Sequence, residues 1–193
     1  QLVLMSFINP MGTDVVNAKI YVTMVVQFAY VFTMSISQAM QIVEGHQLGA
    51  DQKDAAAKSV YYALRWSICT SLILTIIICI FSDWIVGLFP SASAEVLAIA
   101  KQLLMVEILL EIGRAINITM VRALQTAGDV RYPVVMSIIF TWCLSVTMGY
   151  VLGVAMQWGI VGVWIANAAD ELFRGIVLII RFKRGKWQKN KVI

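Results

Sequence analysis

Three charged residues stand in the middle of an otherwise apolar stretch of this chain: Glu107, Glu111 and Arg114. Their spacing of three and four residues places them on one face of a helix. An ionised group at bilayer depth is costly, and such groups face a bundle interior or a wet cavity, usually with a partner. The pattern therefore predicts a buried polar site, and the chemistry that it favours is ion or substrate binding on a transport pathway.

A second charged group occurs further along the chain, in Asp170, Glu171 and Arg174. Arg174 can reach either acid at the spacing of three or four residues. At about 1.5 Å per residue along a helix, the two charged groups overlap in depth, so one buried polar network can hold both. The alternative is that these three residues neutralise one another and only pin two helices together, because a compensated pair is the least costly way to hold charge in a membrane.

The composition of the whole chain predicts an integral membrane protein. Of the 193 residues, 60% are hydrophobic and 13% are charged, and the mean hydropathy is +0.82. A soluble domain has about a quarter of its residues charged. The net charge of +4 comes largely from basic residues that flank the last apolar segment, so the lipid bilayer is the expected partner and nucleic acid is not. These basic residues are Arg181, Lys183, Arg184, Lys186, Lys189 and Lys191.

Hydropathy predicts an all-α polytopic bundle with five membrane-spanning helices in residues 13–182, each near or above the roughly 20 residues that cross a bilayer core. Asp14 can cap the first of these helices, and Ser91 or Ser93 can cap the third. Gly128 and Asp129 separate the third from the fourth. The five helices are expected at about 15–43, 55–89, 94–125, 132–157 and 160–182.

The distribution of Lys and Arg predicts how the helices are oriented. The connections after the first and third helices and the tail at 183–193 are basic, whereas the other two connections have no Lys or Arg. We expect the three basic segments in the cytoplasm, in a multi-pass protein of the cell (inner) membrane. Residues 1–12 form an apolar stub with an Asn-Pro pair, which we interpret as the outer end of a truncated transmembrane helix and hence as part of a larger transporter.

Two motifs resemble the multidrug and toxic compound extrusion (MATE) family. Residues 41–51, QIVEGHQLGAD, resemble the loop after the second helix of each six-helix lobe, and residues 121–133, VRALQTAGDVRYP, resemble the segment between the fourth and fifth helices of a lobe. The resemblance covers essentially the whole chain. It implies the C-terminal lobe of a twelve-helix carrier, with a six-helix N-terminal lobe as the missing partner. Gln38, Gln41 and Glu44 are then expected to line the cavity between the lobes.

The resemblance implies a secondary active antiporter that exchanges a proton or sodium ion for a small, amphipathic, often cationic organic compound by alternating access. In several members, an acid on the fourth helix of the C-terminal lobe is followed three residues later by Gln. In this chain that register falls on Arg114 and Asn117, with Glu111 one turn earlier. Ion-coupling or substrate-binding residues are expected among Glu107, Glu111, Arg114, Asn117, Asp170, Glu171 and Arg174.

Trp142 and Met148 are candidates for a drug pocket, because aromatic and Met side chains make adaptable walls for apolar cations. The alternative is that Met and Trp residues face lipid, the core or the membrane interface.

Two other functions stay open at this point. A lipid-linked saccharide flippase of the same superfamily would use cationic residues such as Arg114 and Arg174 to hold pyrophosphate. A non-transporting membrane scaffold is the third candidate. No motif for hydrolytic or redox catalysis occurs, and the three Cys residues lack metal or redox spacing. We therefore expect no enzyme activity, no metal site and no cofactor other than the coupling proton or sodium ion.

Overall fold

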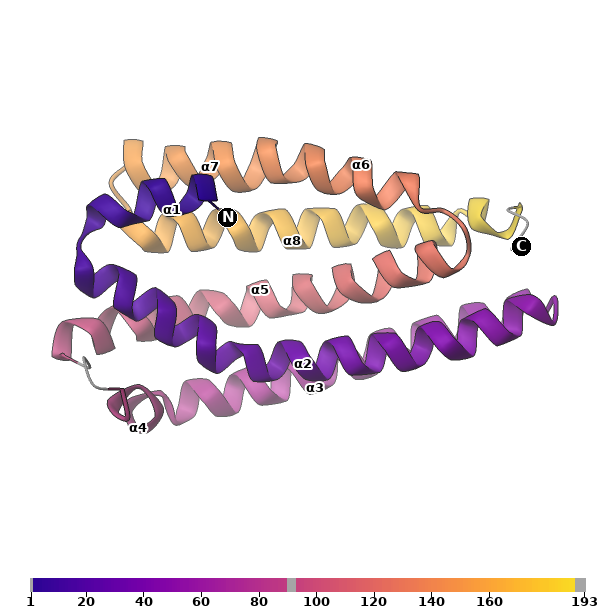
Figure 1. Cartoon of the computed structure of the whole chain (residues 1–193), viewed down its shortest axis with the longest axis horizontal. Coiled ribbons are helices and arrows are strands. Elements are labelled where there is room, and N and C mark those ends of the chain that lie inside the picture. Colours follow the sequence, from indigo (N-terminus) through magenta and orange to yellow (C-terminus); the bar gives the residue numbers. More distant parts are fainter. Residues whose placement is uncertain (1, 90–92, 190–193) are drawn as a thin grey trace.

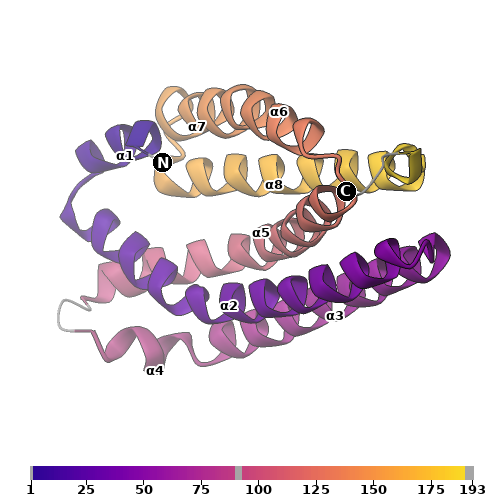
Figure 2. The ribbon, with the colours of Figure 1, turned by 45° about the vertical axis from the view of Figure 1, so that its right-hand side comes forward.

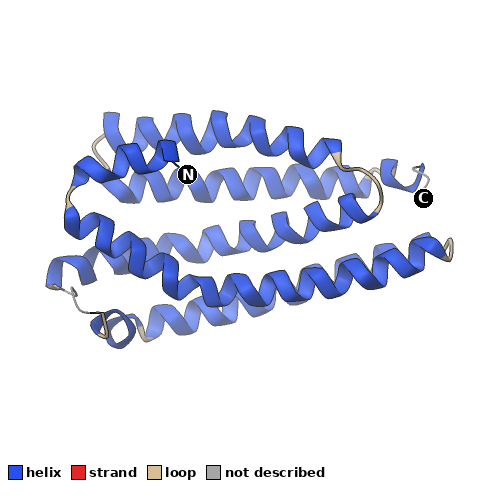
Figure 3. Cartoon of the chain, viewed as in Figure 1, coloured by secondary structure: helices blue, strands red, loops and turns tan. Residues whose placement is uncertain are grey.

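The computed structural model describes residues 2–89 and 93–189, and these residues form an all-α bundle of helices joined by short turns, as the composition predicts (Figure 1). No strand occurs in this described part of the chain (Figure 3). Ser91, one of the two predicted caps of the third long helix, and Lys191 of the basic tail lie outside the described residues. Ser93 caps that helix, with its Oγ accepting a hydrogen bond from the backbone nitrogen of Val96 at 3.2 Å.

Five long helical stretches run along the bundle, and a short helix precedes them. The first elements are α1 (Leu2–Ile8), the 3-10 turn η1 (Asn9–Met11), α2 (Thr13–Gly49), α3 (Lys53–Ile80), α4 (Ser82–Gly87) and α5 (Ala94–Thr126). A fourth long stretch joins α6 (Arg131–Phe140), the π-helical η2 (Thr141–Val146), α7 (Thr147–Tyr150) and the π-helical η3 (Val151–Ala155). The chain continues through α8 (Gly159–Lys183) and the 3-10 turn η4 (Lys186–Lys189).

The helices form two layers with α5 between them. The stretch from α6 to η3 lies beside α8, and α2 lies beside α3 on the other side of α5 (Figures 1 and 2). The α2–α3 turn, the α5–α6 turn and the C-terminal part of α8 meet at one end of the bundle, on the right of Figure 1. We call this the basic end, because it carries Lys53, Lys58, Arg131, Lys183 and Arg184.

The short helix α1 turns away from α2 and packs on the other layer. Gly12 joins the two helices with φ of +114°, a backbone conformation that L side chains rarely adopt. The ring of Phe7 then meets the ring of Tyr150 edge to face, with centroids 5.6 Å apart. Residues at the start of the chain therefore reach α7, on the far side of the bundle from α3 (Figure 1).

The second long helix differs from the prediction of one helix over 55–89. The helix α3 ends at Ile80, Phe81 leaves the helical conformation with φ of −94° and ψ of 15°, and α4 begins at Ser82. Ser82 and Asp83 then occupy the first turn of α4, where small polar and acidic side chains are favoured. Asp83 also pairs with Lys101 of α5 at 2.6 Å, which ties α4 to the next helix.

Three helical stretches are long and apolar enough to cross a membrane: α2, α3 and residues Arg131–Ala155. The helices α5 and α8 have 33 and 25 residues, but they carry the two charged groups in their middle. Their charges are enclosed because α5 contacts α2, α3 and α8. The helices with the most charged side chains therefore have the most protein around them.

Two apolar cores lie at different depths, with a polar layer between them. One core, with Val22, Leu103 and Val163, is remote from the basic end, and the other, with Met120 and Leu178, is close to it. The polar layer between them contains a hydroxyl trio from three helices: Ser37 lies 3.0 Å from Thr119, and Thr119 lies 3.3 Å from Ser67. The residues of the polar layer are Thr33, Ser37, Ser67, Ser71, Thr75, Glu107, Glu111, Thr119, Asp170 and Arg174, all of them buried.

Candidate ion and substrate site

Arg114 holds both carboxylates of the first charged group. Its Nη1 lies 3.2 Å from Oε1 of Glu107 and also donates to Oε1 of Glu111. Glu107 is 2% exposed and Glu111 is fully buried. Two carboxylates on one helix therefore converge on a single guanidinium inside the bundle.

Neighbouring helices supply hydrogen bonds to the other oxygen of each acid. The indole Nε1 of Trp164 in α8 donates to Oε2 of Glu107 at 2.6 Å. The hydroxyl of Ser71 in α3 donates to Oε2 of Glu111 at 2.8 Å. Because a buried carboxylate is stable only when it is paired and hydrogen-bonded, the acids of α5 depend on both α3 and α8.

The second charged group is built in the same way on α8. Nη2 of Arg174 lies 3.1 Å from Oδ2 of Asp170 and 2.8 Å from Oε1 of Glu171. The remaining oxygen of Glu171 accepts a hydrogen bond from Nδ2 of Asn117 in α5 at 2.6 Å. Asn117 thus joins α5 to the charged group of α8. We call these two groups with Asn117 the charge cluster.

The two helices are in backbone contact at the depth of the charge cluster. A Cβ atom added at Gly113 would lie 2.7 Å from the backbone nitrogen of Leu172 and 2.9 Å from Glu171, which is closer than real Cβ contacts. A Cβ atom added at Gly175 would lie 2.9 Å from a side-chain methyl group of Ile116. Glycine lets helices approach this closely in membranes, and the approach brings Asn117 within reach of Glu171.

A cavity of about 570 Å³ lies beside the charge cluster, between α1, α2, α5, η2 and α8. Arg114 lines the cavity, while its partners Glu107 and Glu111 are not among its lining residues in the described part of the chain. Arg114 therefore stands between the cavity and the two acids of α5. The polar lining residues are Lys19, Thr23, Arg114, Thr141, Ser145, Asn167, Asp170, Glu171 and Arg174, and the apolar ones are Leu4, Ile8, Ile20, Met24, Leu110 and Trp164.

The structure brings together the seven residues that the sequence indicates as ion or substrate residues, but not the two drug-pocket candidates. Trp142 is 58% exposed, whereas Thr141 and Ser145 are the positions of η2 that line the cavity. Met148 is half-buried in α7 and does not line this cavity. Trp142 and Met148 therefore do not line this cavity, and their role in a drug pocket stays a prediction.

The three polar residues near the end of α2 do not share one surface as expected. Gln38 is exposed, and Gln41 accepts a hydrogen bond from Arg122 at 3.0 Å. Glu44 is fully buried, and neither of its carboxylate oxygens has a hydrogen-bond partner in the described part of the chain. The expectation for Glu44 is corrected because it lies on the same helix face as Met40, which packs in the core near the basic end.

Sequence reasoning missed Ser71, Trp164 and Lys19. Ser67, Ser71 and Thr75 recur every four residues along the apolar helix α3, and this spacing was an available signal for a polar stripe. Lys19 is a lone cation in an apolar span, which was also a usable signal. No comparable pattern marks Trp164, whose role depends on how α8 packs against α5.

Comparisons with known proteins agree with this architecture. The family model MatE matches residues 1–151. An uncharacterized transporter of Bacillus subtilis (strain 168), YisQ, is 35% identical over 191 residues, which are 97% of this chain and 41% of that protein. A probable multidrug resistance protein, NorM, of Bacillus cereus (strain ATCC 14579) is 28% identical over 152 residues, which are 79% of this chain and 33% of that protein.

A solved structure with a similar fold is the MATE transporter ClbM in complex with Rb⁺. The TM-score is 0.76 at 19% sequence identity, over 90% of this chain and 42% of that one. At this identity the likeness shows the fold alone. The chain spans about two-fifths or less of the length of these relatives.

Proposed function

Because the chain belongs to the MATE family of multi-pass membrane transporters, we propose that it works as the C-terminal lobe of a cation-coupled antiporter. A proton or sodium ion would enter while an amphipathic organic compound leaves, by alternating access between two lobes. The name of the relative NorM, a probable multidrug resistance protein, supports a drug-like cargo. The grouping of the basic turns at one end supports a cytoplasmic position for that end and for the C-terminus.

The excess of acid in the charge cluster is the observation that carries this proposal. Arg114 is shared by two carboxylates, and Arg174 is shared by two others. When all these groups are ionised, the buried cluster has two more negative charges than positive ones. Such an excess is unfavourable in a membrane unless a proton or another cation joins the cluster. The charge cluster is therefore suited to bind the coupling ion.

Cation binding offers a physical link to conformational change. A cation at the charge cluster relieves the repulsion between its carboxylates, and its departure restores that repulsion. A ligand shifts a conformational equilibrium by the difference between its affinities for the two states. The state that gathers the four carboxylates is thus the one that a bound cation stabilises.

The flippase and scaffold readings account less well for this arrangement. Arg114 and Arg174 are already paired with two carboxylates each, so a pyrophosphate group would compete with fixed acids there and would find only Lys19 without an ion pair in the described lining of the cavity. A scaffold has no use for an excess of buried negative charge. The proposed antiporter accounts both for the paired arginines and for the excess of buried negative charge.

The test is Glu111→Gln in the complete carrier, reconstituted in liposomes with a proton or sodium gradient and ethidium as the transported cation. We expect gradient-driven exchange to be abolished while membrane insertion stays normal, because the amide keeps the shape of Glu111 but not its charge. Asp83→Asn makes the same chemical change in an ion pair outside the charge cluster and should exchange normally. Wild-type exchange by Glu111→Gln would exclude this acid as the coupling residue.

The proposed partner is a six-helix N-terminal lobe. The chain covers 41% of YisQ, and alternating access needs a second lobe against which this one moves. Expressed alone, the chain should aggregate or self-associate, and co-expression with the N-terminal half of the carrier should rescue it. Drug and cation exchange by the purified chain in liposomes, without the other half, would contradict the two-lobe mechanism.

A further inference from the structure

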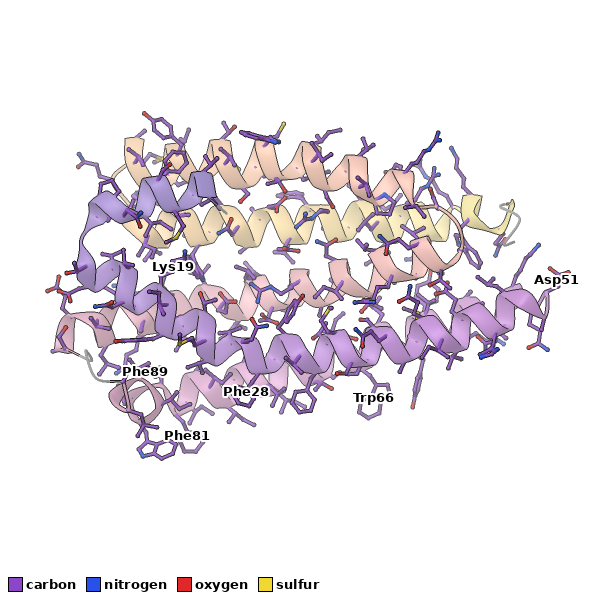
Figure 4. The ribbon with its side chains drawn as sticks, viewed as in Figure 1. Lys19, Phe28, Asp51, Trp66, Phe81 and Phe89 are labelled. Carbon is purple, nitrogen blue, oxygen red and sulfur yellow. The ribbon has the colours of Figure 1, made fainter. Side chains whose placement is uncertain are left out.

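The cavity beside the charge cluster contains a cation that is not part of that cluster. Lys19 lines the cavity from α2, and Figure 4 shows it on the side of α2 that faces α8. Its ammonium group donates a hydrogen bond to the thioether sulfur of Met5 in α1. No carboxylate in the described part of the chain forms an ion pair with it. A thioether is a weak acceptor, so this contact does not take the place of a direct ion pair for Lys19.

The other two cations of the cavity, unlike Lys19, already have ion-pair partners. Arg114 and Arg174 each hold two carboxylates. A negatively charged group that enters the cavity therefore meets competition at either arginine but none at Lys19. An unpaired cation at membrane depth is unfavourable and is usually found with a partner. A bound anionic group would supply that partner.

The wall of the cavity that α8 forms has an unused acceptor. Oδ1 of Asp170 is buried and has no hydrogen-bond donor in the described part of the chain, although its other oxygen pairs with Arg174. Asp170 and Lys19 line the same cavity from α8 and α2. The cavity thus offers a cation on one wall and a carboxylate oxygen on the other.

Apolar side chains contribute part of the same lining. Ile8, Met24 and Trp164 are among the lining residues. A volume of about 570 Å³ is within the range of sites that hold drug-sized molecules, which combine apolar walls with a few polar groups that fix orientation. The ligand that uses all of these features is amphipathic and has opposite charges at two separated positions.

We propose that Lys19 is an anion-binding subsite, and that it gives the carrier a preference for amphipathic zwitterions over compounds that are only cationic. The anionic group of the cargo contacts Lys19, and its ammonium group faces Asp170. This inference rests on the proposed export function and narrows its substrate class. Lys19 is then a residue that selects the cargo, and Asp170 is the point at which the cargo's ammonium group and the coupling ion compete for the charge cluster.

A matched pair of fluorescent ligands tests this proposal. Nα-dansyl-lysine has a carboxylate and an ammonium group, and dansylcadaverine is the same molecule without the carboxylate. Binding of each to the purified complete carrier is measured by fluorescence polarisation. Because a hydrogen bond between charged groups contributes about 1.5–3 kcal/mol, Lys19→Met should weaken binding of dansyl-lysine by about tenfold or more. The affinity for dansylcadaverine should change by less than about twofold in the same variant.

Two further variants serve as controls, one for the charge of Lys19 and one for the loss of a lysine outside the cavity. Lys19→Arg keeps the positive charge and should keep the preference for dansyl-lysine. Lys101→Met removes a lysine that pairs with Asp83 outside the cavity, and it should leave the binding of both ligands unchanged. An equal loss of affinity for both ligands in Lys19→Met, or no loss for either, would overturn the anion subsite.

The outcome for the subsite is distinct from the outcome for the export function. Equilibrium binding decides the role of Lys19 without any gradient, whereas gradient-driven exchange of dansylcadaverine tests the antiporter. Normal exchange with an unchanged ligand preference in Lys19→Met would contradict only the subsite. A changed preference in a carrier that exchanges neither ligand would contradict only the export function.

Discussion

Two fully buried glutamates of this bundle have opposite surroundings. Glu111, in the charge cluster, has a guanidinium on one oxygen and the hydroxyl of Ser71 on the other. Glu44, near the basic end of α2, has no hydrogen-bond partner on either oxygen in the described part of the chain. An ionised carboxylate without compensation is very unfavourable in an apolar interior. The surroundings of Glu111 therefore suit an ionised acid, and those of Glu44 suit a neutral one.

This difference shows that burial of an acid in a membrane helix does not by itself identify an ion site. At the charge cluster, four carboxylates share two guanidinium groups, and under the proposed function a cation would balance the excess negative charge. At Glu44 the neutral form needs no cation. Substitutions that remove charge, a partner or a close contact should therefore affect the two regions differently.

The largest effect is expected for Arg174→Ala. It leaves the buried carboxylate of Asp170 and the partly buried carboxylate of Glu171 without their cation, and removal of one partner of a buried ion pair costs about 3–5 kcal/mol. Thermal unfolding of the complete carrier should show a sharp loss of stability. Adding Asp170→Asn should recover part of it. Strictly additive effects in this double-mutant cycle would show that the two residues do not interact.

A smaller loss is expected for Gly113→Ala. The new methyl group would meet the backbone of Leu172 at 2.7 Å, so α5 and α8 must separate, and overpacking of this kind costs about 1–3 kcal/mol. Gly49→Ala is the control, because a Cβ atom at Gly49 has no atom within 4 Å. Unchanged stability in Gly113→Ala would show that the charge cluster tolerates a wider spacing of the two helices.

Ser71→Ala should cost about 1.5 kcal/mol, because it removes one hydrogen bond to a buried carboxylate while Arg114 remains. The same variant should also lower the affinity for the coupling ion, measured by the ion concentration that gives half-maximal exchange. Ser35→Ala removes a hydroxyl that is exposed and bonds to its own helix, and it should change neither quantity. Equal effects of the two substitutions would contradict a role of Ser71 in the charge cluster.

The smallest effect is expected for Glu44→Gln. If the acid is neutral, an amide of the same shape should change stability by less than about 1 kcal/mol and leave exchange intact. The new amide can donate to Oε1 of Gln47, which lies one turn further along α2 and has no donor in the described part of the chain. Loss of exchange in this variant would show that Glu44 also takes part in ion coupling.

The elements were more predictable than the contacts between them. The apolar runs and the rise per residue of a helix predicted that the residues around Glu111 and Asp170 lie at similar depth in the membrane. The structure brings the two charged groups together through Asn117. The break at Phe81 was not predicted, because the apolar run continues through α4 and hides the effect of Ser82 and Asp83. Periodicity gives the face on which a residue lies, but it does not give the neighbour of that face.

The residues that complete the site show the same limit. The donors Ser71 and Trp164 come from helices distant in sequence, and their choice depends on how each helix is rotated about its own axis. The rotation of α2 also decides that Glu44 is buried and that Lys19 lines the cavity. A single sequence does not specify these rotations.

The contact at Gly113 also has a mechanical consequence. At Gly113 the backbones of α5 and α8 are in direct contact, and no flexible side chain lies between them that could adjust. We therefore expect that α5 and α8 must separate before one can slide along the other. Under the proposed alternating-access mechanism, we expect the two helices and the acids that they carry to move together as one rigid unit. Gly12, which precedes α2 with φ of +114° and where a Cβ atom would have no atom within 4 Å, is the position at which we expect α1 to move relative to the rest of the bundle.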